Sequence, residues 1–154
     1  MRDLEVPSRL IATFFGAGYS PAAPGTVATV ATLPLYLILR RLSLPWYLLF
    51  TVGLTLLGVC ASERMERLWG KDPGKIVIDE VAGTLIALVS RPAGMGGILL
   101  AMALFRFFDI LKPPPVSTAE ALPGGAGVMA DDVVAGALSA VSLTLIRKTL
   151  KNPL

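Results

Sequence analysis

Five carboxylates border long apolar stretches of the sequence, where a charge is costly. They are Asp79, Glu80, Asp109, Asp131 and Asp132. A carboxylate inside a membrane segment costs about 3 kcal/mol on insertion scales, so its presence indicates function. Carboxylates that crowd together repel one another unless a cation lies between them. We therefore expect these acids, which come from three apolar segments, to share one site with a bound cation.

The sequence offers only oxygen ligands for such a cation. It contains no histidine, which also excludes hydrolases that depend on a catalytic histidine. The single cysteine, Cys60, lies within an apolar run and is interpreted as a packing residue. Oxygen ligands favour Mg²⁺, Mn²⁺ or Ca²⁺ over zinc or copper.

A second group of charged residues combines an acid with two bases. Arg106, Asp109 and Lys112 are spaced by three residues and would share one face of a helix. In a metal–phosphate site the acid would hold the metal, and the two bases would meet the phosphate oxygens. The alternative is an ion pair within the helix, with Lys112 extending to the membrane interface.

The adjacent acids also have structural alternatives. Asp79 and Glu80 would complement the dipole of a helix that begins there, and Gly83 would then let a partner or a ligand approach Asp79. Asp131 and Asp132 would cap a last helix predicted over 133–150. Both alternatives are compatible with a catalytic role for at least one acid of each pair.

Two glycine-containing stretches are candidate anion-binding loops. The sequence GAGYSPAAPGT at 16–26 precedes a predicted helix that Thr26 would cap, with backbone amides available to an anion. A second loop is predicted over 116–130, and the amides of Gly124, Gly125 and Gly127 would fold around phosphate. For each stretch an ordinary turn or flexible loop is an equal alternative.

The composition indicates which environment these residues occupy. Hydrophobic residues make up 54% of the 154 residues and charged residues 16%, whereas soluble domains carry about a quarter charged residues. Much of the chain should therefore face lipid. The net charge of +3 fits basic loops. The lysines and arginines form no patch interleaved with aromatic residues, so nucleic-acid binding is not expected.

The elements that must position the acids are therefore predicted to be membrane helices. Apolar segments cover 27–42, 42–62, 76–90, 93–111 and 133–150, and 10–26 is partly helical or re-entrant. A polar loop is expected after residue 62, and Pro34 is expected to kink its helix. We predict a single all-α domain over residues 1–154, a polytopic integral membrane helical bundle with about four to five membrane segments, some short or re-entrant.

Five crossings would bring all the acids to one side of the membrane. The distribution of basic residues weakly favours the cytoplasm for that side. Acids at the ends of segments, beside bases, favour phosphate chemistry over the ion path of a small cation or proton transporter. A non-catalytic lipid-binding subunit is a further alternative. The sequence does not fix an oligomeric state.

Four stretches together resemble the phosphatidylglycerophosphatase A family. They are GAGYSPAAPGT at 16–26, IVIDEVAG at 76–83, FRFFDILKPPPV at 105–116 and GGAGVMADDVVAG at 124–136, in the order in which the family has them. Members of this family remove the terminal phosphate of phosphatidylglycerophosphate, with Mg²⁺ as the cofactor, and leave phosphatidylglycerol. The resemblance implies this activity in phospholipid biosynthesis, or a related one on another lipid phosphate.

The resemblance also implies roles for individual residues and a location. Asp79, Glu80, Asp109, Asp131 and Asp132 would be catalytic, and all of these except Glu80 would bind metal. Arg106 and Lys112 would bind the phosphate, with Thr26 as a further contact. The partners would be the lipid substrate and the bilayer. That bilayer would be the bacterial inner membrane, with the site facing the cytoplasm.

Overall fold

A computed structural model describes residues 4–71 and 73–150, and these residues form helices and no strand. The helices are α1 (Glu5–Ala12), α2 (Pro24–Leu39), α3 (Leu44–Trp69), α4 (Ile78–Ala87), α5 (Met95–Leu111), α6 (Val116–Glu120) and α7 (Gly124–Leu150). Two short 3₁₀ turns, η2 (Ala17–Tyr19) and η3 (Leu88–Ser90), lie between them. The predicted all-α class is confirmed.

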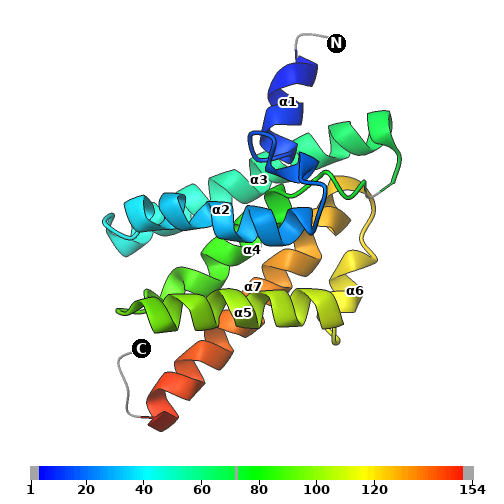
Figure 1. The fold of residues 1–154 in the computed structure, drawn as a ribbon. Coiled ribbons are helices and arrows are strands. Elements are labelled where there is room, and N and C mark those ends of the chain that lie inside the picture. The colour runs from blue at the N-terminus through cyan, green and yellow to red at the C-terminus, as the bar shows by residue number, and fades with distance from the viewer. Residues whose placement is uncertain (1–3, 72, 151–154) are drawn as a thin grey trace.

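The short helix α4 is the centre of the bundle. It packs chiefly against α7 and also contacts α2, α3 and α5, as Figure 1 shows. Seven of its residues are buried: Ile78, Val81, Ala82, Gly83, Thr84, Leu85 and Ala87. Ten residues give a helix of about 15 Å, which is half the thickness of a bilayer core. The α-helix within the segment predicted over 76–90 is therefore short, as that prediction allowed.

Among the described residues, two helices are long and apolar enough to cross a membrane. They are α3 over Leu44–Trp69 and α7 over Gly124–Thr149. Large apolar side chains such as Trp46, Leu49 and Leu56 are exposed along α3, and Ile38, Leu99 and Leu145 are exposed on the other long helices. A soluble monomer rarely exposes apolar surface on this scale. These two helices support a membrane bundle, whereas four to five crossings stay a prediction.

Several predicted boundaries were wrong by a turn or more. Helix α2 begins at Pro24, where the fixed φ of proline suits a first helical position, and it continues through Pro34 without interruption. Helix α3 extends to Trp69, so Arg64 and Arg67 lie on its last turns and not in the predicted loop. The hydropathy of the sequence does not indicate a helix there, because the final turns of α3 are polar. The acid predicted in that loop at position 72 lies outside the described residues.

The largest correction concerns the last helix. Helix α7 begins at Gly124, nine residues before the predicted start at 133. The glycines were interpreted as loop residues, because glycine is a poor helix former in isolation. In the folded chain they allow close packing. A Cβ at Gly125 would meet the backbone of α3, and a Cβ at Gly127 would meet the carbonyl of Leu122.

Candidate functional site

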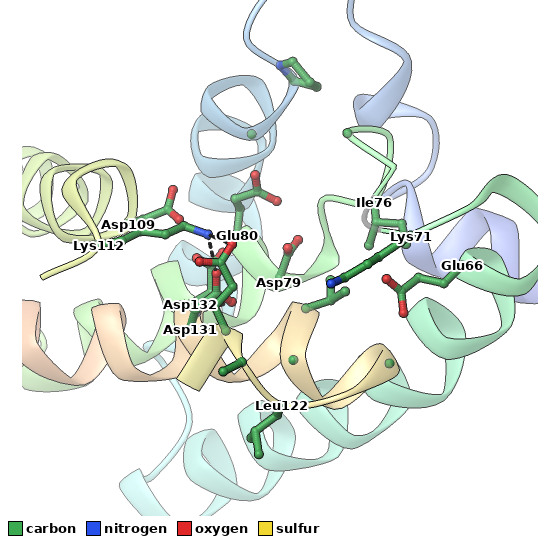
Figure 2. A pocket seen from close by; sticks show the side chains of 18 of the residues that line it. Glu66, Lys71, Ile76, Asp79, Glu80, Asp109, Lys112, Leu122, Asp131 and Asp132 are labelled. Atoms are coloured by element: carbon green, nitrogen blue, oxygen red, sulfur yellow. Dashed lines mark hydrogen bonds and ion pairs between the residues drawn. The ribbon is translucent and has the colours of Figure 1, made fainter. Parts of the chain in front are cut away.

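The structure brings all five candidate acids to one cavity. Asp79 and Glu80 lie in the first turn of α4, Asp109 lies near the end of α5, and Asp131 and Asp132 lie on α7. All five line a cavity of about 700 Å³, and so do Arg106 and Lys112. Figure 2 shows the carboxylates from the three helices converging, with the Lys112 side chain reaching over them from the end of α5.

The carboxylates form two groups that share Asp132. One oxygen each from Asp79, Glu80 and Asp132 lie within 4.8 Å of one another, and the same holds for Asp109, Asp131 and Asp132. This spacing suits oxygen ligands around a hard divalent cation. Because Asp132 belongs to both groups, it is the carboxylate common to every cation position that these acids offer.

Buried oxygens without partners support the same interpretation. Asp79 Oδ1, Glu80 Oε2 and Asp132 Oδ2 are inaccessible and accept no hydrogen bond from the described residues. An unpaired buried carboxylate oxygen is costly, and several together also repel one another. A bound divalent cation would remove both costs. The donor set of this cavity therefore fits a cation such as Mg²⁺.

Arg106 lies between the acids of α4 and α5. Its Nη1 is 2.7 Å from Asp109 Oδ2 on the same helix and 3.7 Å from Glu80 Oε1 on α4. The ion pair within the helix that was weighed as the alternative therefore exists, but it faces the cavity. Arg106 Nε is buried and donates no hydrogen bond. The guanidinium thus keeps donor capacity for an anion inside the cavity.

Lys112 links α5 to the two elements that follow. Its Nζ donates to Asp131 Oδ2 at 2.8 Å and to Glu120 Oε1 at 2.6 Å. Burial lowers the pKa of Lys112, but the hydrogen bonds to Asp131 and Glu120 outweigh burial, and the pKa is raised above that of an ordinary lysine. The lysine is therefore a stable positive charge at the rim of the cavity.

Two glycines allow the acids of α4 and α7 to meet. A Cβ at Gly83 would approach the carbonyl oxygen of Asp132 to 2.7 Å and would also strike the Phe105 ring. A Cβ at Gly136 would approach the backbone of Gly83 on the facing helix. Gly83 was expected to leave room for a partner or a ligand beside Asp79. Instead it leaves room for α5 and α7.

Asp131 and Asp132 lie in the interior of α7 and do not cap it, because the helix begins seven residues before Asp131. The capping alternative is therefore wrong. Asp131 accepts hydrogen bonds from Lys112 and from the backbone N–H of Asp132, whereas Asp132 Oδ2 has no partner. The two neighbours thus differ. Asp131 is held by the protein, and Asp132 is free to bind a ligand.

The loop at 16–26 contributes backbone and not the residue that was expected. Ala23, Pro24 and Gly25 line the cavity, whereas Thr26 is exposed and does not line it. Since α2 begins at Pro24, Thr26 lies within the helix and does not cap it. A Cβ at Gly25 would strike the Glu80 carboxylate and approach Arg106 Nη1 to 3.0 Å. Gly25 therefore makes space for the charged pair behind it.

Four residues of this region were not predicted from the sequence. Glu63 of α3 accepts a hydrogen bond from the Gly125 N–H at 2.9 Å and so anchors the first turn of α7. Glu66 and Lys71 line the cavity on the other side of Asp79 from Lys112, as Figure 2 shows. Glu120, which was interpreted as an ordinary loop acid, ends α6 and pairs with Lys112. No local sequence pattern distinguishes these four residues from ordinary surface charges, because their roles depend on contacts with other elements.

The arrangement combines acids that fit a cation with bases that fit an anion. The acids that would hold a cation and the bases that would bind phosphate oxygens, Arg106 and Lys112, line the same cavity. The wall between Ala121 and Gly124 consists of loop and helix-start backbone. This chemistry suits binding and transfer of a phosphoryl group.

Comparison with known proteins identifies close relatives. The family model described as Phosphatidylglycerophosphatase A matches residues 10–147. Proteins of that name from Haemophilus influenzae and Escherichia coli are 39% and 35% identical, over 92% and 91% of this chain and 89% and 83% of their own lengths. A Bacteroides thetaiotaomicron protein named Putative phosphatidylinositol-3-phosphatase is 40% identical over 90% of this chain and 92% of its own length. No solved structure matches the chain.

Proposed function

The chain belongs to the phosphatidylglycerophosphatase A family and is a phosphoric monoester hydrolase, and from this premise we propose that it hydrolyses phosphatidylglycerophosphate to phosphatidylglycerol and phosphate with Mg²⁺. One observation carries the proposal. Carboxylates from three helices meet two bases in a cavity of about 700 Å³. That cavity is large enough to admit a phosphorylated glycerol head group.

Asp79, Asp109, Asp131 and Asp132 would hold the metal, with Asp132 common to both groups. The unpartnered oxygens of Asp79 and Asp132 support this assignment. When bound, Mg²⁺ would neutralise phosphate charge and orient the phosphoryl group for in-line displacement. Lys112 holds Asp131 through a hydrogen bond, so the position of this carboxylate is fixed before substrate arrives.

Arg106 and Lys112 would bind the phosphate oxygens that are transferred. Both line the cavity, and both are anchored by carboxylates, which restricts their motion. Preorganised donors of this kind stabilise charge that develops in the transition state. Thr26 is exposed outside the cavity, so the backbone of Ala23–Gly25 is the better candidate for the contact that had been assigned to Thr26.

We favour water as the nucleophile, with Glu80 as the base. Glu80 Oε2 is buried without a partner, and Glu80 Oε1 lies 3.7 Å from Arg106 Nη1, so the carboxylate faces the cavity beside a candidate phosphate-binding residue. In this step the water oxygen would form a bond to phosphorus as Glu80 accepts one water proton and the P–O bond to the lipid glycerol breaks. The glycerol alkoxide would take a proton from solvent water, and Glu80 would then return its proton to the solvent. Direct attack by an aspartate is the alternative, and it would leave a phosphorylated protein that acid quenching would trap.

A phosphorylated inositol lipid is the second candidate substrate. It is favoured by the relative that is named Putative phosphatidylinositol-3-phosphatase, which is 40% identical to this chain. The two candidates share a phosphomonoester on a lipid head group and differ in the size and stereochemistry of the alcohol. Either lipid would leave its tails in the bilayer beside α3 and α7 while its head group enters the cavity.

A panel assay of purified protein in detergent tests the proposal. Phosphate release is measured from phosphatidylglycerophosphate, phosphatidylinositol 3-phosphate, phosphatidic acid and a soluble phosphomonoester, each with Mg²⁺ and with EDTA. We expect Mg²⁺-dependent release that is fastest from phosphatidylglycerophosphate. Faster release from the inositol lipid would establish the second candidate, and release that EDTA leaves unchanged would exclude the metal-dependent mechanism.

We also propose that the bundle resides in the bacterial inner membrane with its cavity toward the cytoplasm. The exposed apolar faces of α3 and α7 support the membrane part. A cysteine introduced at the exposed Lys71, beside the cavity, should react with a membrane-impermeant maleimide only after cells are opened. Labelling of intact spheroplasts would reverse the orientation. The native Cys60 is exposed and would react as well, so it is replaced before the new cysteine is introduced.

A further inference from the structure

A second charged cluster lies at the end of the bundle opposite the acidic cavity. It contains Arg40 at the end of α2, Arg91 after η3, and Arg147 near the end of α7. In Figure 1 these helix ends lie at the left, whereas the start of α2 and the end of α5, which line the cavity, lie at the right. Along α7, Asp132 and Arg147 are about 22 Å apart at 1.5 Å per residue.

Two tyrosine rings lie beneath two of these arginines. The Arg40 guanidinium lies over the Tyr36 ring at 5.6 Å, and that of Arg91 lies over the Tyr47 ring at 5.3 Å. The two rings pack edge to face with 6.4 Å between their centroids. All three arginines are close enough to Tyr36 to interact with it electrostatically. Cation–π contacts therefore orient the guanidiniums without neutralising them.

This cluster has no acidic counterpart. No Asp or Glu occurs in the sequence at 6–62, 81–108 or 133–150, so none of the three arginines has an acid close to it along the chain. Among the described residues, none of the ion pairs involves Arg40, Arg91 or Arg147. Three positive charges therefore share one region with no carboxylate among the described residues paired to them, which favours an anionic ligand.

The hydrogen-bonding capacity of the cluster is also largely unused. Arg40 donates to the Pro92 carbonyl at 3.4 Å, and Arg147 donates to the Ser90 carbonyl at 3.2 Å. Arg91 Nε and Nη2, the Tyr36 hydroxyl and the Ser90 hydroxyl are buried without partners among the described residues. Water could occupy such donors, but it would not balance the charge. A group with several anionic oxygens satisfies both needs, and arginine matches phosphate geometry well.

The backbone at Arg91 supports a ligand role. Arg91 has φ +50° and ψ 64°, a left-handed conformation that is unfavourable for a residue with a side chain. Glycine or asparagine would suit this position better. In this conformation the Arg91 guanidinium lies over the Tyr47 ring, and its Nε and Nη2 have no partner among the described residues.

The surroundings identify the source of the phosphate as lipid. Trp46, exposed by 63%, adjoins Tyr47, and exposed Ile38 and Leu145 flank the arginines along α2 and α7. Aromatic residues beside apolar helix faces are typical of a membrane interface. The separation of about 22 Å from the cavity approaches the thickness of a bilayer core. We propose that Arg40, Arg91 and Arg147 bind the phosphate group of an anionic phospholipid in the leaflet opposite the acidic cavity.

Lipid retention tests this site. Purified protein is exchanged into micelles that contain phosphatidylserine or phosphatidylcholine, and bound lipid is counted by native mass spectrometry. The test variant is Arg91→Gln with Arg147→Gln, and the matched control is Arg41→Gln with Lys148→Gln, which removes the same charge from exposed neighbours. We expect the test variant to lose phosphatidylserine affinity about tenfold or more, as loss of charge-assisted hydrogen bonds implies, while the control keeps it.

Three further measurements distinguish a general charge effect, free phosphate and binding in the acidic cavity from the proposed lipid site. Equal loss in both double variants would overturn the proposal, because it would show only a general charge effect. Displacement of phosphatidylserine by inorganic phosphate at equal concentration would overturn the lipid assignment. Retention should persist in Asp132→Asn protein, and loss there would place the lipid in the acidic cavity. Phosphatase activity in neutral detergent reports folding, and the single Arg147→Gln variant replaces the double variant if that activity is absent.

Discussion

Replacement of Asp132 by asparagine separates the catalytic from the structural role of the acidic cavity. Asp132 is 2% exposed, belongs to both carboxylate groups and has a buried oxygen without a partner. Asparagine keeps the shape of the side chain but removes the charge. We expect turnover to fall about 10³-fold, which corresponds to about 4 kcal/mol of lost transition-state stabilisation.

The same substitution should not destabilise the metal-free protein. Two ionised carboxylates at the 4.8 Å limit of either group repel by about 3.5 kcal/mol at an effective dielectric constant of about 20. Proton sharing among the acids reduces this repulsion in the parent, so only part of it is recovered. We expect the melting temperature of the Asp132→Asn protein in EDTA to equal or exceed that of the parent by a few degrees. Mg²⁺ should then raise the melting temperature of the parent but not that of the variant.

The assay pairs phosphate release with thermal unfolding, each in Mg²⁺ and in EDTA. Glu5→Gln serves as the control, because Glu5 is an exposed acid on α1 outside the cavity. It should retain full activity and the parental response to Mg²⁺. Near-parental turnover in Asp132→Asn would refute the reasoning, and so would an Mg²⁺-induced rise in its melting temperature equal to that of the parent.

Three further outcomes are expected from residues around the cavity. Gly83→Ala should destabilise the protein by about 1–3 kcal/mol through overpacking and reduce turnover, whereas Gly53→Ala in α3, where a Cβ meets nothing within 4 Å, should be neutral or stabilising in thermal unfolding. The folded-state pKa of Lys112 is raised, so the stabilisation from its charge is complete at any pH below the ordinary lysine pKa. This stabilisation is lost only as the pH rises through the raised pKa. Melting temperatures measured in a pH series should therefore show no decrease that depends on Lys112 up to about pH 10. A decrease at lower pH that is absent from the Lys112→Met variant would contradict this expectation. Glu63→Ala should lower the melting temperature by removing the acceptor for the Gly125 N–H, while Glu63→Gln, which keeps an acceptor oxygen, should lower it less. Equal losses would show that the hydrogen bond does not contribute to stability.

The sequence determined the class of the protein and the chemical types in its site. A hydrophobic content of 54% with few charges predicts apolar helices, because a helix satisfies its own backbone in lipid. Acids kept beside such helices are costly, and their positions therefore predicted Asp79, Glu80 and Asp109 as candidate site residues, which the fold places in one cavity. The absence of histidine limited the ligands to oxygen.

The local sequence pattern predicted the wrong helix start where packing against another helix decides the backbone conformation. Gly124 and Gly127 resemble loop residues in isolation, but in the fold they begin α7, because neighbouring backbone approaches closely and Glu63 accepts the Gly125 N–H. The start of α7 in turn places Asp131 and Asp132 in a helix interior and not at a cap. Such contacts join residues far apart in the chain, and no local propensity reports them.

Only the tertiary structure decided which charges share a site. The crossing of α4 and α7 at Gly83 and Gly136 brings Asp132 within reach of both Asp79 and Asp109. The same crossing carries Arg147 to the far end of the bundle, beside the turn at Ser90. Periodicity specifies which face of a helix a residue occupies, whereas the distance between faces of different helices depends on side-chain volume at the crossing point.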